Sequence, residues 1–181
     1  MYEEEYANIE HYAQEAGFEH YHLLDPATMV MKQEVRDMCK ANTCGKYGAS
    51  WSCPPACGTI EEYAEQVHKY HWGIVVQTVG QLEDSLDFEG IMEASETHSK
   101  RFLKMVEQMR EDCSGILPLG AGTCMICKKC TYPDEPCRFP EKRITSVEAT
   151  GVVVNEMCKA NGLEYNYGPN TIAYTSCVLV G

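Results

Sequence analysis

The amino-acid sequence predicts an α/β protein: a single sheet flanked by helices. Segments with helical periodicity alternate with short apolar runs, the pattern of a sheet covered by helices. A length of 181 residues suits one domain with a substantial core, and no Ser/Gly-rich linker or fixed-period repeat divides the chain. We therefore expect one α/β domain over residues 1–181, with cysteine-rich metal-binding loops at 39–58 and 120–143 on one edge of the sheet.

Helices are expected where apolar residues recur every three or four positions. In the longest such segment, Phe102, Val106 and Met109 follow one another at these spacings. A shorter segment begins at Thr59, which forms a capping box with Glu62 three residues later. The helices expected on these grounds span residues 3–16, 59–70, 90–112 and 145–161, while residues 27–38 form either a helix or a loop.

Strands are expected in the apolar runs between these helices. The sequences GIVVQTV at 73–79 and TIAYTSCVLV at 171–180 predict buried strands, and residues 19–24 and 115–119 predict shorter ones. Each cysteine loop follows a strand and precedes a helix. If the preceding strands are parallel, both loops leave the sheet at its carboxyl edge and face each other across one crevice.

The charge balance restricts the partners of the protein. Fifteen basic residues stand against twenty-seven acidic ones, a formal net charge of −12. Such a surface repels phosphate backbones, so we expect no nucleic-acid partner. The N-terminal sequence MYEEEYANIEHY lacks the features of a secretory signal, and no run of eighteen apolar residues occurs. We therefore expect a cytoplasmic protein without a membrane partner.

Eleven cysteines are the most informative feature of the composition. An odd number of cysteines in a reducing compartment argues against a disulfide framework and favours metal binding. The second loop has the pattern C-x2-C-x2-C-x6-C, whose first three cysteines match the start of a bacterial ferredoxin run. Zinc remains the alternative, because two cysteine pairs also suit a tetrahedral zinc site. The candidate ligands are Cys124, Cys127, Cys130 and Cys137.

The first loop offers a second group with the pattern C-x4-C-x8-C-x3-C, formed by Cys39, Cys44, Cys53 and Cys57. Four thiolates would saturate a [4Fe–4S] cluster, whereas three would leave one iron open to a ligand. The aromatic residues Tyr47 and Trp51 either shield this site from water or pack in the core.

The other three cysteines and a basic cluster complete the candidate residues. Cys113, Cys158 and Cys177 lie on apolar stripes or strands, as small buried hydrophobic residues do. Three basic residues follow the second cysteine group and would neutralise cluster charge, hold an anion or simply face solvent. They are Arg138, Lys142 and Arg143.

The cysteine motifs resemble those of a family of small bacterial and archaeal proteins described as predicted metal-binding proteins, a domain of unknown function. The matching segments are CGKYGASWSCPP at 44–55 and CMICKKCTYPDEPCRFPEKRITSVEATGVVV at 124–154. The resemblance implies an iron–sulfur metal site in the cytoplasm of mainly anaerobic microbes. It also implies that Cys44 and Cys53 matter most in the first group, and that the position of Cys57 is less fixed.

Three functions follow from these observations. The first is an iron–sulfur protein with two [4Fe–4S] clusters that transfers electrons, or has an accessory role in reductive metabolism, with a redox partner protein. The second is an enzyme that uses an open-site cluster to reduce a small molecule or remove its sulfur. The third is a structural module that binds zinc.

Overall fold

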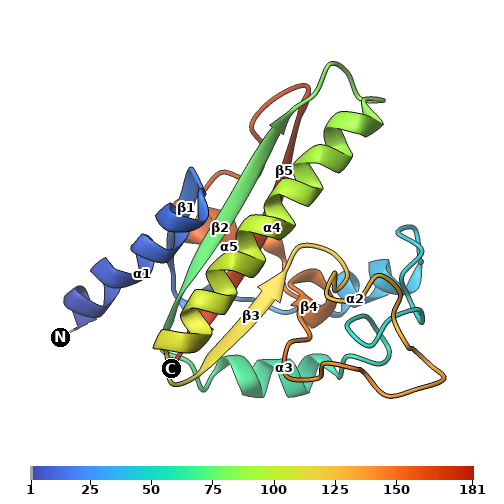
Figure 1. Ribbon diagram of the computed structural model, residues 1–181, viewed down its shortest axis with the longest axis horizontal. Coiled ribbons are helices and arrows are strands. Elements are labelled where there is room, and N and C mark those ends of the chain that lie inside the picture. The colour runs from blue at the N-terminus through green and yellow to red at the C-terminus, as the bar shows by residue number, and fades with distance from the viewer. Residues whose placement is uncertain (1) are drawn as a thin grey trace.

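A five-stranded mixed sheet forms the centre of the computed structural model, which describes residues 2–181 and their side chains from residue 8 onward (Figure 1). Its strand order is β1-β2-β5-β3-β4. The expected α/β fold with one sheet flanked by helices is therefore confirmed. The strands are β1 (His20–Leu24), β2 (Trp72–Gln81), β3 (Ile116–Gly120), β4 (Thr145–Ser146) and β5 (Thr171–Val180).

The helices agree with most of the sequence-based expectations. The capping box at Thr59 is present: the Glu62 amide donates to Thr59 Oγ1 at 3.1 Å, and Glu62 Oε2 accepts from the Thr59 amide at 2.8 Å. The α-helices are α1 (Tyr2–Ala16), α2 (Gln33–Lys40), α3 (Ile60–Val67), α4 (Phe88–Asp112) and α5 (Val154–Ala160), with short 3-10 helices η1 (Pro26–Thr28) and η2 (Glu148–Thr150).

The pairing directions differ from the expected parallel arrangement. Strand β2 is antiparallel to both β1 and β5, and β5 is antiparallel to β3. It follows that β1 and β3, the strands before the two cysteine loops, run in opposite directions. The prediction that both loops leave the sheet at a common carboxyl edge is therefore wrong. Among the described strands, β3 and β4 form the parallel pair.

Helices cover both faces of the sheet. On one face, Ile74 and Val178 pack with Phe102 and Met105 of α4, and α1 joins the same cluster through Ala13. Figure 1 shows α4 running along the sheet on this side, with α5 behind it. The other core cluster contains alternate strand residues and part of α5: Val75, Cys177, Leu179, Met157 and Cys158.

The helix expected over residues 145–161 is interrupted. Gly151 adopts φ +92°, and its carbonyl accepts a hydrogen bond from the Lys32 amide at 2.8 Å. Next to it, Val152 forms an isolated β-bridge with Met31. Long-range pairing with residues 30–32 thus holds this backbone in an extended conformation despite its helical periodicity, and α5 begins only at Val154.

The cysteines predicted to be core residues are partly confirmed. Cys158 and Cys177 are fully buried, whereas Cys113 is half-buried after the end of α4 and packs against the core cluster from its edge. In the span 2–181, no helix combines the length and the apolar character that a membrane crossing requires.

Candidate metal centres

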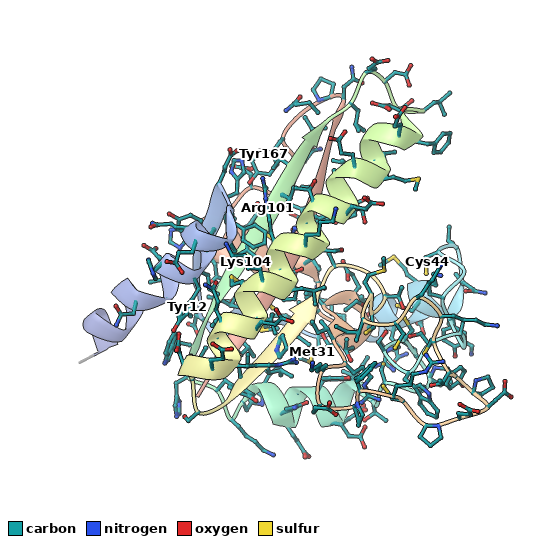
Figure 2. The ribbon with its side chains drawn as sticks, viewed as in Figure 1. Tyr12, Met31, Cys44, Arg101, Lys104 and Tyr167 are labelled. Atoms are coloured by element: carbon teal, nitrogen blue, oxygen red, sulfur yellow. The ribbon has the colours of Figure 1, made fainter. Side chains whose placement is uncertain are left out.

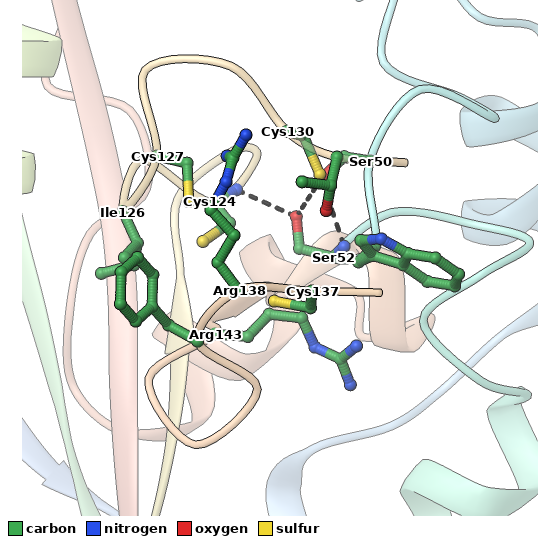
Figure 3. A pocket seen from close by; sticks show the side chains of 12 residues that line it. Ser50, Ser52, Cys124, Ile126, Cys127, Cys130, Cys137, Arg138 and Arg143 are labelled. Carbon is green, nitrogen blue, oxygen red and sulfur yellow. Dashed lines mark hydrogen bonds between the residues drawn. The ribbon is translucent and has the colours of Figure 1, made fainter. Parts of the chain in front are cut away.

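The second cysteine loop connects β3 to the edge strand β4 and surrounds a small cavity of about 30 Å³. Figure 3 shows side chains from both cysteine loops around this cavity. Ser50, Trp51 and Ser52 of the first loop form part of its wall. The structure thus brings together all four cysteines predicted in this loop, which line the cavity: Cys124, Cys127, Cys130 and Cys137.

The first cysteine loop borders a much larger cavity, of about 500 Å³. Cys39, at the end of α2, lines it together with Cys44 and Cys53. Figure 2 places Cys44 among other sulfur atoms, on the side of the molecule away from α1. The cavity also borders the second loop through Thr123 and the segment after β4 through Glu148.

Cys57, the fourth cysteine predicted in this group, has different neighbours. It packs with Tyr63 and Ala149 in a small core cluster and is 7% exposed. Its Sγ lies 3.9 Å from the carbonyl oxygen of Gly58 and 3.9 Å from Nη2 of Arg36. The structure therefore groups three of the four predicted cysteines around one cavity and holds the fourth in a neighbouring core.

A buried hydrogen-bond joint connects the two cysteine loops. The hydroxyl oxygen of Ser52, which is fully buried, accepts a hydrogen bond from the Cys124 amide at 3.0 Å, drawn as a dashed line in Figure 3. The same hydroxyl lies 3.3 Å from Oγ1 of Thr123, and the Cys53 thiol donates to that Thr123 oxygen at 3.4 Å. The two loops are therefore in direct contact, although the strands that precede them are not parallel to each other, contrary to the expectation from the sequence.

Hydrogen bonds in the second loop stabilise a thiolate at Cys130. Burial alone would raise the pKa of Cys130. Hydrogen bonds from the backbone of Trp51 and Tyr132 and from the Ser50 hydroxyl outweigh that effect, and the pKa falls below its ordinary value. Because metals bind thiolates rather than thiols, these donors favour metal binding.

Basic side chains surround the same loop. Arg138 and Arg143 line the cavity, and Nη1 of Arg138 donates a hydrogen bond to the Lys129 carbonyl oxygen at 2.8 Å. The guanidinium of Arg138 therefore supports the loop backbone. Positive charge at the cavity wall opposes the repulsion among several thiolates, so two of the three predicted basic residues lie where they can neutralise a metal centre.

Burial affects two thiols of the first cysteine group. Burial raises the pKa of Cys39 and of Cys57, and the nearby Arg36 opposes the shift without reversing it. Arg36 also donates from Nη2 to the Gly58 carbonyl oxygen at 2.9 Å. A metal at this group would displace protons from buried thiols, so its binding would weaken at low pH.

The two aromatic residues proposed as shields occupy different cavities. Trp51 lines the second-loop cavity, where its Nε1 donates to the Glu135 carbonyl oxygen at 3.0 Å and its ring meets Tyr132 edge-on at a centroid distance of 4.9 Å. Tyr47 lines the larger cavity. Each aromatic ring therefore lies beside one cysteine group.

Several residues of the site were not identified from the sequence. Ser52 and Thr123 connect the loops, and the repeated serines beside Cys53, in the segment SWSC, were an available signal for Ser52. No sequence motif identifies Arg36 or Glu148 as a residue of the site. In the described part of the chain, no three His, Cys, Asp or Glu side chains meet closely enough to hold one metal ion, and the thiols instead border the two cavities.

The donor set fits a metal centre. Four thiols line one cavity, with hydrogen bonds to one sulfur and arginines beside it, and thiols are the ligand type of both iron–sulfur clusters and zinc. Among the described residues, these thiols do not converge on a position for a single ion. All eleven cysteines are free thiols. The fold and these cavities define a cysteine-rich metal-binding α/β protein.

The chain belongs to the family described as predicted metal-binding protein (DUF2284), whose model matches residues 22–180. The metal-binding family indicated by the cysteine motifs is thereby confirmed. Comparisons with curated proteins and with solved structures give no match.

Proposed function

We propose that this protein carries two [4Fe–4S] clusters and works in one-electron transfer in the cytoplasm, where thiols remain reduced. The observation that carries the proposal is the convergence of a C-x2-C-x2-C-x6-C segment on one small cavity. Cys124, Cys127, Cys130 and Cys137 would hold one cluster. The first cysteine loop would hold the other through Cys39, Cys44 and Cys53, with Cys57 as the remaining candidate ligand.

A bound [4Fe–4S] cluster exchanges single electrons, at a potential set by charge, burial and hydrogen bonds to sulfur. The residues of this chain supply each of these influences. Donors from Trp51 and Tyr132 reach the Cys130 sulfur, and the arginines at the cavity wall add positive charge. Both effects stabilise the reduced cluster, which carries more negative charge than the oxidised one. They therefore raise the reduction potential of the cluster.

A redox partner protein is part of this proposal. Electron transfer requires a centre close to the surface, and each of the four cysteines of the second loop is only partly buried. Two large apolar side chains are exposed beside them, Met125 at 61% and Phe139 at 40%. These side chains provide apolar contact area for a partner protein next to the cluster.

Metal analysis tests the proposal directly. Protein purified without oxygen should contain about eight irons and eight acid-labile sulfides per chain, as two four-iron cubes require. Cys127→Ala should halve both numbers, whereas the matched variant Cys113→Ala should retain them, because Cys113 lies outside both cavities. Zinc without sulfide would overturn the electron-transfer role and support the zinc module, whose folding would depend on that metal.

A further inference from the structure

The two cysteine groups differ in the space around them. The second-loop cavity measures about 30 Å³ and is bordered by four cysteines. The first-loop cavity measures about 500 Å³ and is bordered by three. A volume of several hundred cubic ångströms is typical of sites that bind small molecules. The first cysteine group therefore has one candidate ligand fewer than the second and borders a larger cavity.

Cys57 is held in a small core beside the cavity, and its amide donates to the Cys53 carbonyl oxygen at 3.1 Å. The Tyr63 hydroxyl donates to the Cys57 carbonyl oxygen at 2.6 Å and lies 3.1 Å from Oγ1 of Thr145. The Cys57 thiol faces the Gly58 carbonyl oxygen and Arg36. Ala149 belongs both to this small core and to the cavity wall. Turning Cys57 toward the cavity would therefore disturb a packed and hydrogen-bonded core.

We propose that Cys39, Cys44 and Cys53 alone hold the first cluster, and that its fourth iron faces the 500 Å³ cavity and binds a small carboxylate with an apolar body. This inference rests on the proposed function, because it requires a four-iron cluster at this group. Three cysteines leave one iron without a protein thiolate, which is the open position that metal-centred binding of a substrate requires.

The cavity lining indicates the class of ligand. Much of the wall is apolar, which favours an apolar or aromatic body. The lining holds one basic side chain, Lys46, which would provide the countercharge for a carboxylate. The carboxylate oxygen would bind the open iron. The carboxyl group of Glu148 also lines this wall, and burial raises its pKa, which disfavours its charged form. The apolar part of the wall includes Val35, Met38, Tyr47, Pro54 and Ala149.

The ligand assignment is tested by comparing two cysteine variants under anaerobic conditions. Cys57→Ala should keep about eight irons per chain, whereas Cys53→Ala should fall to about four. Mild oxidation of the wild type should release about one iron and give the electron paramagnetic resonance signal of a three-iron cluster, because an iron without a cysteine is lost most easily. A loss of four irons in Cys57→Ala would overturn the assignment. A wild type without iron would instead refute the proposed function itself.

The cavity is tested with benzoate as the probe. Benzoate should change the electron paramagnetic resonance spectrum of one reduced cluster and leave the other unchanged. Ala41 lines the cavity, so Ala41→Phe should weaken benzoate binding at least tenfold while the iron content stays constant. Ala49→Phe provides a matched control in the same loop, at an exposed position outside the cavity lining. Equal benzoate affinity in Ala41→Phe and the wild type, or no spectral change in the wild type, would overturn the proposal.

Discussion

The buried histidine between α4 and the sheet makes stability depend on pH in a predictable direction. His98 is 2% exposed, with Nδ1 at 3.0 Å from Thr78 Oγ1 and Nε2 at 2.7 Å from Ser176 Oγ. Its ring stacks on Phe102 with an interplanar angle of 9°. Burial, assisted by the charge of Arg101, lowers the pKa of His98 to about 4.

The sign of the effect follows from proton uptake. A histidine in the unfolded chain has a pKa of about 6.5, so between pH 6.5 and 4 the unfolded state binds more protons than the folded state. The contribution of neutral His98 to the free energy of unfolding is therefore fully present above pH 6.5 and is lost as the pH falls toward 4. The difference of the two pKa values corresponds to a total loss of about 3 kcal/mol, of which about 2 kcal/mol falls between pH 7 and pH 5.

Urea unfolding at pH 7 and at pH 5, without oxygen, measures this loss. The wild type should lose about 2 kcal/mol more over this interval than His98→Gln, which has no imidazole to protonate. Both proteins carry the same metal ligands, so the pH dependence of metal binding cancels in the comparison. His68→Gln serves as a matched control, because His68 is exposed, and it should behave like the wild type. Equal pH dependence in the wild type and His98→Gln would refute the reasoning.

Two further changes test the joint between the loops and the turn after η2. Ser52→Ala leaves the Cys124 amide without its acceptor, which should lower the free energy of unfolding by about 1–3 kcal/mol. It should also speed the loss of iron from both cysteine groups in a chelator assay. Faster loss from one group alone would contradict a connection shared by both loops. Gly151→Ala combines φ +92° with a Cβ atom 3.1 Å from Ile60 and should lower the free energy of unfolding by about 2–3 kcal/mol. Gly168 has φ +102° but no atom within 4 Å of an added Cβ, so Gly168→Ala should lower the free energy of unfolding by only about 1 kcal/mol. Equal melting temperatures for the two glycine variants would exclude a clash between the added Cβ and Ile60.

Local signals explain what the sequence could predict. Thr59 and Glu62 lie three residues apart, so their capping box can be read directly from the chain. The apolar character of β2 and β5 likewise predicts buried strands. Strand order and direction depend on partners distant in the sequence, which no short segment encodes.

The candidate site shows the same contrast between what a local sequence pattern predicts and what depends on long-range packing. The spacing of the second cysteine group identified all four cysteines that line its cavity. In contrast, the contact between Ser52 and Cys124 joins positions 72 residues apart, and the separation of Cys57 from the larger cavity depends on Tyr63 and Ala149. Side-chain packing of this kind follows from the tertiary fold, which a cysteine pattern alone does not specify.

The central place of β5 has a consequence for synthesis on the ribosome. Residues 171–180 follow the other four described strands in the chain, yet they lie between β2 and β3 in the sheet. Until this strand inserts, β3 and β4 have no sheet connection to β1 and β2. The segments that carry the two cysteine groups are then translated and exposed before the sheet between them is complete. A metal site that needs both cysteine loops in their final positions would therefore be completed only after β5 has inserted into the sheet.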